Sequence, residues 1–507
     1  MKTEGRWKKA YFNTFASLLL ELVTIACGLI LPRLILRSFG SVYNGVVSSI
    51  TQFISCVTLL RSGLGGVTRA ALYKPLSQGD RVSVSSIVRA TEGFMRRVSR
   101  IYVGLLVMFA AVYPFIVSEF DWVFTFTLVL ILGISKFFEC RFGIAYQFLL
   151  QADQRRYIVE IIRCICLILN TVVAALLIKA GGSIHIVKLG SAFVFILEPF
   201  LIYIYAKKRY KLDKKAKEDE RTLNQRWEAF AHQVAAFVTT NTDIMVLTVF
   251  CDIRLVSVYS VHNMITAPMK NLITSLANGA EAAFGDMLAR CEGERLTEKF
   301  RVYEYTVFTV SALLFTCTAI LIASFVSIYT GGITDTDYYR PLFGCLMAAA
   351  QFAVGIRLPY QTLVETSGRF RETRNGAIAE AAINIIISVV LVKLLGLIGV
   401  AIGTITAVLF RTVQYALYVD KHMIKGCFAS FLKNLAVNLV FSAVMYVIIA
   451  CLPRFITTSY MQWAVYAAAV FITGCVLMAA FGFVFSRRVF MELIRASFSI
   501  FRGRKRR

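Results

Sequence analysis

Apolar blocks of about 20 residues or more recur along the whole 507-residue chain, separated by short polar gaps. Such a block is too long for the core helix of a soluble protein, but it matches the length that crosses ~30 Å of hydrocarbon. The composition agrees, since 58% of the residues are hydrophobic, 17% are charged and the mean hydropathy is +0.67. These features exclude a soluble enzyme, a disordered chain and a secreted disulfide scaffold. They predict an all-α polytopic membrane protein.

Breaks at proline, glycine and charged residues divide the apolar sequence into about fourteen transmembrane helices. Their approximate cores are 11–37, 42–64, 96–117, 121–150, 157–178, 183–206, 228–250, 255–280, 303–329, 341–365, 375–395, 397–419, 431–452 and 461–485. Lys and Arg gather in the gaps on one side. The opposite gaps hold only Arg37, Lys179, Arg254, Arg340, Lys393 and Arg454. Because cytoplasmic loops retain positive charge, we expect both termini in the cytoplasm and a first helix that is not cleaved.

An internal duplication organises these helices. A shift of 214 residues aligns Tyr146 with Tyr360, Arg155 with Arg369 and Asn170 with Asn384. An even number of helices per repeat predicts two six-helix lobes of the same orientation, related by a pseudo-two-fold axis along the membrane normal. The predicted domains are an N-lobe (1–206), a basic cytoplasmic linker (207–226), a C-lobe (227–422) and a region (423–507) with two further helices and a basic tail.

Polar residues line up in equivalent places of the two lobes. In 42–64, Ser48, Gln52, Ser55 and Ser62 share one helical face. The predicted helix 255–280 repeats the plan with Asn263, Lys270, Asn271, Thr274 and Asn278, and the helices before them carry Glu21 and Asp243. Such stripes cannot face lipid cheaply, so they face one another or a water-filled cavity. The alternative for Ser, Thr and Asn is ordinary hydrogen bonding between helices.

Nine basic residues fall inside the predicted helices, although each such charge costs several kcal/mol unless it meets water, a partner or the interface. They are Arg33, Arg61, Lys136, Arg141, Arg163, Lys188, Lys270, Arg357 and Arg411. Arg61 and Lys270 are the first candidates for an aqueous cavity, with Arg33, Arg141 and Arg357 behind them. Arg33 could instead reach the headgroups, and Lys136, Glu139 and Arg141 could form a local ion pair. We expect Arg163 and Arg411 to extend to the cytoplasmic interface.

Helix breakers mark candidate hinges at Pro32, Gly63 and Pro268, although proline kinks also occur in static bundles. The 12 cysteines are scattered and only four histidines exist, so no metal site is predicted, and we expect no cofactor. No catalytic motif and no large extracellular loop are present, which disfavours an enzyme. The net charge of +25 lies in the gaps between helices, a pattern typical of topology signals and contacts with anionic lipids rather than of nucleic-acid binding.

Several stretches resemble the polysaccharide-flippase (Wzx-like) branch of the MATE-like (MOP) exporter superfamily. Residues 32–41 (PRLILRSFGS) resemble the family's opening, as do 62–66 (SGLGG) followed by 72–76 (LYKPL). Residues 241–244 (NTDI), 258–260 (VYS) and 283–285 (AFG) resemble the start of its second half. The resemblance covers most of the chain and implies two six-helix lobes plus two helices.

The resemblance implies a flippase that carries a polyprenyl-pyrophosphate-linked oligosaccharide by alternating access, in the inner membrane of a bacterium. Arg61 and Lys270 would then meet the phosphates, with Arg33, Arg141 and Arg357 as further contacts. Ser55, Gln52, Asn263, Asn271 and Asn278 would bind sugar hydroxyls. Glu21 and Asp243 would hold the cationic side chains or bind a coupling cation, and a glycan polymerase or ligase would be a partner. The alternatives are a lipid II flippase, a MATE-type small-molecule or cation antiporter, and a non-transporting scaffold of a glycan-synthesis complex.

Overall fold

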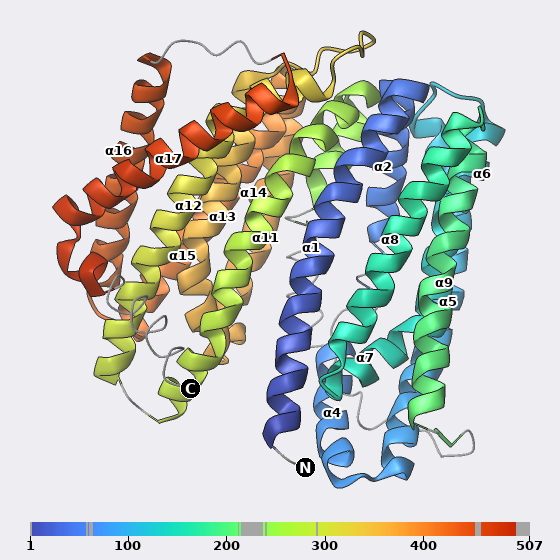
Figure 1. Cartoon of the computed structure of the whole chain (residues 1–507), viewed down its shortest axis with the longest axis horizontal. Coiled ribbons are helices and arrows are strands. Elements are labelled where there is room, and N and C mark those ends of the chain that lie inside the picture. The colour runs from blue at the N-terminus through green and yellow to red at the C-terminus, as the bar shows by residue number, and fades with distance from the viewer. Residues whose placement is uncertain are drawn as a thin grey trace. The chain divides into compact units, whose positions relative to one another are not determined.

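The computed structural model describes residues 3–56, 59, 64–210, 212–213, 237–238, 241–290, 293–451 and 458–492 (Figure 1). Every regular element in these ranges is helical, which confirms the predicted fold class. The helices form two compact units. Unit 1 comprises Met1–Ser260 with Gly332–Thr336, and unit 2 comprises Val261–Gly331 with Asp337–Arg507. Arg61, Gly63 and most of the predicted linker 207–226 lie outside the described residues.

Unit 1 is built from long helices joined by tight turns. They are α1 (Thr3–Phe39), α2 (Ser41–Ser55), α4 (Leu64–Gln78), α5 (Arg81–Ile116), α6 (Trp122–Phe138), the π-helix η1 (Glu139–Gly143), α7 (Ile144–Ala152), α8 (Arg156–Lys179), α9 (Ile184–Tyr210), Asn241–Phe250 and the start of α11 (Ile253–Ala289). Gly40 forms the turn between α1 and α2 at a φ of 90°, which favours glycine. Asp335 then caps α2 by accepting the Ser41 N–H at 2.6 Å.

Unit 2 continues with the remainder of α11 and with helices that are apolar over most of their length. They are α12 (Gly293–Tyr329), α13 (Pro341–Thr366), α14 (Phe370–Leu395), α15 (Leu397–His422), α16 (Cys427–Cys451) and α17 (Tyr460–Phe485). Pro341 stands at the first position of α13, where its missing N–H leaves no helical hydrogen bond unmade. The core around Phe300, Phe308 and Tyr360 joins α12, α13, α15 and α16.

Among the described residues, eleven helical segments are long and apolar enough to cross a membrane, and they coincide with eleven of the predicted segments. The other three predicted segments, 42–64, 228–250 and 255–280, are those that carry the polar stripes or the acidic Asp243. Described parts of them form α2, the short helix Asn241–Phe250 and α11, whose 37 residues exceed a bilayer thickness but include several polar side chains. Two of these helices are thus shorter than a membrane span within the described residues, and the third carries several polar side chains.

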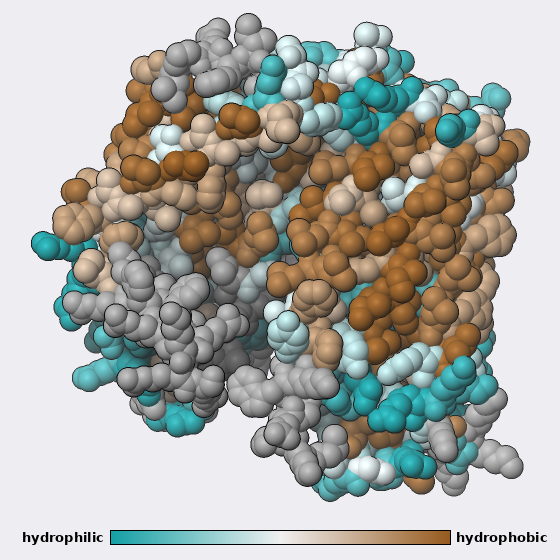
Figure 2. Space-filling model, in the orientation of Figure 1, coloured by the Kyte–Doolittle hydropathy of each residue, from teal (hydrophilic) through white to brown (hydrophobic). Residues whose placement is uncertain are grey.

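The outer face of α8 shows how unit 1 meets lipid. Ile161, Ile165, Ile168, Val172 and Leu176 recur three or four residues apart and are 40–61% exposed. Figure 2 shows hydrophobic side chains over this part of the surface, with hydrophilic ones gathered toward the ends of the helices. An apolar stripe bounded by polar ends is the pattern of a membrane-spanning surface, so the chain is a multi-pass membrane protein.

The duplication predicted from the sequence recurs as matching contacts inside the two units. The Tyr146 hydroxyl donates to Glu92 at 2.5 Å in unit 1, and the Tyr360 hydroxyl donates to Glu304 in unit 2. Eight residues after each tyrosine the backbone takes a positive φ, at Gln154 (57°) and Gly368 (73°). The arginine that follows each, Arg155 or Arg369, then reaches a tyrosine hydroxyl at 3.4 Å in its own unit.

Candidate functional site

Unit 1 contains a partly open cavity of about 550 Å³ among α1, α2, α6, η1, α8 and α9. Five charged side chains line it: Lys136, Glu139, Arg163, Lys188 and Glu198. Ser, Thr and Asn side chains contribute further polar groups, and Leu31, Leu132 and Phe195 are among the apolar ones. A largely apolar cavity with several charged side chains, inside a lipid-exposed bundle, is a candidate ligand site.

Two local irregularities shape the cavity wall. The π-helix η1 adds one residue to a helical turn, a feature that is frequent at functional sites. Gly143 at its end lies so close to α9 that a Cβ there would be 2.9 Å from the Pro199 Cβ. Because Pro199 stands inside α9, it also removes one helical hydrogen bond at the same level. Together these residues let η1 and α9 approach while Glu139 and Glu198 reach the cavity.

Four of the charged cavity residues form two ion pairs. Lys136 Nζ lies 2.7 Å from Glu139 Oε2, so the local ion pair is the alternative that the structure adopts for these residues. Arg163 donates Nε and Nη2 to the same oxygen of Glu198, at 3.0 and 2.9 Å. Arg163 thus meets a carboxylate of the neighbouring helix, and its extension to the cytoplasmic interface stays a prediction.

Some polar side chains of α2 contact other helices, and others line the cavity. Asn44 donates to Ser257 at 2.8 Å, Ser49 bonds Thr248 at 2.8 Å, and Gln52 donates to Asn241. These bonds hold α2 against Asn241–Phe250 and the start of α11, as expected of polar stripes that face one another. Thr51 and Ser55 instead line the cavity, and the Ser55 hydroxyl also donates to the Gln52 carbonyl at 2.5 Å.

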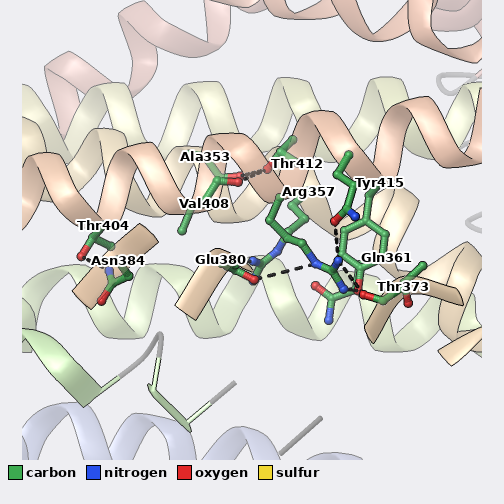
Figure 3. Close-up of polar contacts among 12 residues, drawn as sticks. Ala353, Arg357, Gln361, Thr373, Glu380, Asn384, Thr404, Val408, Thr412 and Tyr415 are labelled. Atoms are coloured by element: carbon green, nitrogen blue, oxygen red, sulfur yellow. Dashed lines mark hydrogen bonds and ion pairs between the residues drawn. The ribbon is translucent and has the colours of Figure 1, made fainter. Parts of the chain in front are cut away.

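Unit 2 contains a buried network around one carboxylate, which Figure 3 shows in close-up. Arg357 Nη1 lies 2.6 Å from Glu380 Oε1, and Arg411 Nε lies 3.8 Å from Glu380 Oε2. Arg411 is 2% exposed and donates to the Thr373 carbonyl and the Tyr415 hydroxyl, each at 2.8 Å. The expectation that Arg411 reaches the interface was wrong, because these partners compensate its burial in the interior.

Lys270 lies near this network on α11 and is half-buried. The flanking Met269 and Ile273 pack against apolar residues of α12 and α13, which brings Lys270 within electrostatic range of Arg357. Within the part of the chain that the structure describes, no hydrogen bond or ion pair involves the Lys270 ammonium. Lys270 and Arg357 thus lie near each other in unit 2, and among the described residues Lys270 has no carboxylate partner.

The remaining candidates lie in different surroundings. Asn263 is half-buried and Asn271 is exposed on α11, while Glu21 and Arg33 are half-buried on α1. The Arg141 guanidinium lies 4.8 Å above the ring of Phe142, and buried Asp243 accepts the Tyr259 hydroxyl at 2.8 Å. Pro32 and Pro268 stand inside α1 and α11, which continue as helices past them. Arg61, Gly63 and the Asn278 side chain lie outside the described residues.

Sequence reasoning assigned no role to Lys188, Asn170, Glu198 or Glu380. Lys188 was visible as an embedded charge, and Glu198 and Glu380 stand inside predicted helices. What was missing is the rotation of each helix, which decides whether an embedded side chain meets a partner or a cavity. In the described residues no cluster of three His, Cys, Asp or Glu side chains is placed to hold a metal ion.

No protein-family model and no curated protein matches the chain. Its structure is similar to the lipid II flippase MurJ in an inward closed conformation, with a TM-score of 0.70 at 16% identity over 94% of this chain and 98% of MurJ. An inward-facing multidrug resistance MATE transporter of the MOP superfamily gives a TM-score of 0.58 at 12% identity, covering 80% of this chain and 94% of that one. The MATE transporter VcmN of Vibrio cholerae gives 0.57 at 12% identity, covering 83% and 97%.

Identities this low carry an argument about the fold alone. The matches extend over nearly the full length of each solved protein, so the likeness is not limited to one bundle of helices. The chain therefore has the fold that the lipid II flippase MurJ shares with MATE transporters of the MOP superfamily.

Proposed function

We propose that the chain is a flippase that moves a polyprenyl-pyrophosphate-linked oligosaccharide across the cytoplasmic membrane of a bacterium by alternating access, for cell-surface polysaccharide assembly. The observation that carries the proposal is the likeness over 94% of the chain to a solved lipid flippase, at a TM-score of 0.70. The embedded basic residues support it. A sugar-pyrophosphate headgroup is large, polar and anionic, and it needs a hydrated, cationic route while its lipid tail stays in the bilayer.

In this proposal Lys270 binds the phosphates, with Arg61, Arg33, Arg141 and Arg357 as further contacts. Arg357 already pairs with Glu380, whereas no hydrogen bond or ion pair in the described residues involves the Lys270 ammonium, so its charge is available to a passenger. Asn263, Asn271, Asn278, Gln52 and Ser55 supply hydrogen bonds to sugar hydroxyls. Glu21 and Asp243 balance charge or bind a coupling cation, and a glycan polymerase or ligase receives the product.

Lipid II is the second candidate substrate. The TM-score with MurJ exceeds the values of 0.58 and 0.57 for the two MATE transporters, which favours a lipid-linked substrate over a small cation. Lipid II carries the same anionic linkage, so Lys270 would serve either headgroup. A cation antiporter would instead favour an acidic binding surface, and a scaffold would transport neither.

The test is translocation by the full-length protein in proteoliposomes, with two fluorescent lipid-linked substrates, an oligosaccharide and lipid II, and with ethidium under a proton gradient. We expect transfer of a lipid-linked substrate and no ethidium uptake. Lys270→Ala should slow transfer about ten- to a hundred-fold, the loss expected of one charge-assisted hydrogen bond. Lys270→Arg should retain most of the rate.

Lys433→Ala is the matched control, because Lys433 is an exposed lysine of unit 2 on α16. Its rate should equal that of the wild type. Ethidium uptake without lipid transfer would replace the proposal by the antiporter, and no transport of any of the three would favour the scaffold. Equal rates for Lys270→Ala and the control would remove Lys270 from the binding site.

A further inference from the structure

The cavity of unit 1 has one charge more than its ion pairs can balance. Lys136 is paired with Glu139 and Arg163 with Glu198, which leaves Lys188 among the charged residues that line it. Lys188 is 8% exposed, and no hydrogen bond or ion pair joins it to any residue in the described ranges. A buried ammonium without a partner is costly, so its retention calls for a compensating group.

The position of Lys188 makes its burial more informative. α9 begins at Ile184, so Lys188 lies only about one turn, ~6 Å, from the end of the helix. A lysine there has a stem long enough to bring its ammonium to the interface, and lysines near helix ends usually do so. Lys188 instead lines the cavity. The surrounding helices thus keep the Lys188 ammonium at the cavity although the end of the helix is within reach of its side chain.

Asn170 supplies a second unsatisfied group in the same cavity. It lies on α8, is 4% exposed, and its buried Oδ1 has no hydrogen-bond donor among the described residues. Oδ1 is an acceptor, whereas the Lys188 ammonium is a donor. A ligand that satisfies both must therefore offer an anionic or acceptor oxygen to Lys188 and a hydroxyl or N–H to Asn170.

The duplicated region of unit 2 shows what the same helices look like without the lysine. A shift of 214 residues places Asn384 at the position of Asn170, Ile402 at that of Lys188 and Thr404 at that of Gly190. Asn384 Nδ2 donates to Thr404 Oγ1 at 3.1 Å, while its buried Oδ1, like that of Asn170, has no hydrogen-bond donor among the described residues. The unsatisfied asparagine oxygen therefore recurs in both units, whereas the buried lysine beside it, Lys188, is a property of unit 1.

We propose that the unit 1 cavity binds a monoanionic, hydroxyl-bearing ligand of the sugar-acid class. The single uncompensated charge fits one carboxylate, which Lys188 binds, and Asn170 accepts a hydrogen bond from a ligand hydroxyl. Thr51, Ser55, Ser135 and Ser191 line the cavity and offer hydroxyls to the remaining polar groups. The apolar part of the lining contains Phe195, whose ring can face the carbon-bound hydrogens of a sugar. The ligand is either a free sugar acid or an acidic sugar within a lipid-linked glycan.

The experiment measures equilibrium binding of glucuronate, by calorimetry, to the full-length protein in nanodiscs. Glucose tests whether the carboxylate is required, and acetate tests whether the hydroxyls are. We expect glucuronate to bind at least ten-fold more tightly than either. Lys188→Met should weaken glucuronate binding about ten- to a hundred-fold, the loss of one charge-assisted hydrogen bond, and Asn170→Leu severalfold.

Lys188→Met keeps the length of the side chain and removes a buried charge, so we expect it to fold, and Lys188→Arg retains the charge and should retain binding. Lys433→Met is the matched control and should leave the affinity unchanged. A second arm replaces glucuronate by a lipid-linked glucuronosyl probe in the same nanodiscs. Lys188-dependent binding of the free acid identifies a soluble ligand, and Lys188-dependent binding of the lipid-linked probe alone identifies a glycan. Binding that is equal in the wild type and in Lys188→Met, or absent for both probes, overturns the proposal.

Discussion

At the scale of single residues, three arginines of the interior differ from two of its lysines, Lys188 and Lys270. Buried or half-buried Arg163, Arg357 and Arg411 each meet a carboxylate of a neighbouring helix. Arg411 also lies 4.1 Å above the ring of Tyr415. Removing one partner of such a buried pair is strongly destabilising, because it leaves an uncompensated charge. The paired arginines therefore serve the architecture, whereas Lys188 and Lys270 keep charge available for a ligand.

Glu380→Gln tests this division. The substitution removes the shared carboxylate of Arg357 and Arg411, and we expect it to destabilise unit 2 by about 3–5 kcal/mol. The measurement is the thermal unfolding of the detergent-solubilised protein. Glu372→Gln is the control, since Glu372 is an exposed carboxylate on the same helix, α14. Equal unfolding temperatures for the two variants would show that the arginines do not depend on Glu380.

At the scale of elements, one carboxylate joins three helices at one end of unit 1. Asp153, in the turn between α7 and α8, accepts Lys9 Nζ of α1 at 3.1 Å and the Tyr210 hydroxyl of α9 at 2.6 Å. Arg155 Nε adds a third bond at 2.7 Å. Burial raises the pKa of Asp153, but these hydrogen bonds lower it further than burial raises it, so the pKa lies below its ordinary value of 3.8.

The direction of this pKa shift determines the pH range in which Asp153 stabilises the fold. A carboxylate whose pKa is lower in the folded state stabilises the fold at pH values above its unfolded pKa, and the contribution is lost as the pH falls through the folded value. We expect Asp153→Asn to lower the unfolding temperature by a constant amount from pH 7 to pH 5. The difference should shrink below about pH 4. Asp252→Asn, at an exposed pair with Arg254, should have little effect at any pH. A difference for Asp153→Asn that persists undiminished to pH 3 would contradict the assignment.

The helices were predictable because lipid leaves a spanning segment few alternatives to the α-helix, so apolar length alone locates most of them. The π-helix Glu139–Gly143 was not predictable in this way. Its residues lie inside the predicted segment 121–150, and the close approach of Gly143 to Pro199, 56 positions away in the sequence, leaves no mark in that pattern. The same limit applies to the cavity, whose lining comes from six elements and depends on how each is rotated.

At the scale of the whole chain, the duplication could be predicted from the sequence because it left identical residues at a constant spacing. The contacts of Tyr146 with Glu92 and of Tyr360 with Glu304 show that the repeats also fold alike locally. The site candidates were less predictable. Lys270 and Arg357 do lie together, but Gln52 contacts another helix, and Lys188 received no role. The type of an embedded residue predicts that its polar or charged group needs a partner, but it does not predict which partner that group has.

The orientation in the membrane is the prediction that belongs to this scale. The positive-inside rule puts the basic residues 207–226 in the cytoplasm and the turn at Gly181 and Gly182 outside. Reporter fusions test this directly. A cytoplasm-dependent fluorescent reporter joined after residue 211 should be active, and an alkaline phosphatase reporter joined after residue 182 should be active. The reverse pattern at both positions would invert the topology and place both termini outside.

The ion pairs within the matching hairpins α8–α9 and α14–α15 have opposite polarity, although the closer partner of Glu380, Arg357 of α13, lies outside the second hairpin. In unit 1 the arginine is on the earlier helix of the pair (Arg163 on α8, Glu198 on α9), whereas in unit 2 it is on the later one (Glu380 on α14, Arg411 on α15). If α8 were to pair with α15 during folding, two arginines would adjoin, and α14 with α9 would bring two glutamates together. The two related hairpins therefore differ in where their charges lie. This difference disfavours the pairing of a helix from one repeat with a helix from the other while both insert into the same bilayer.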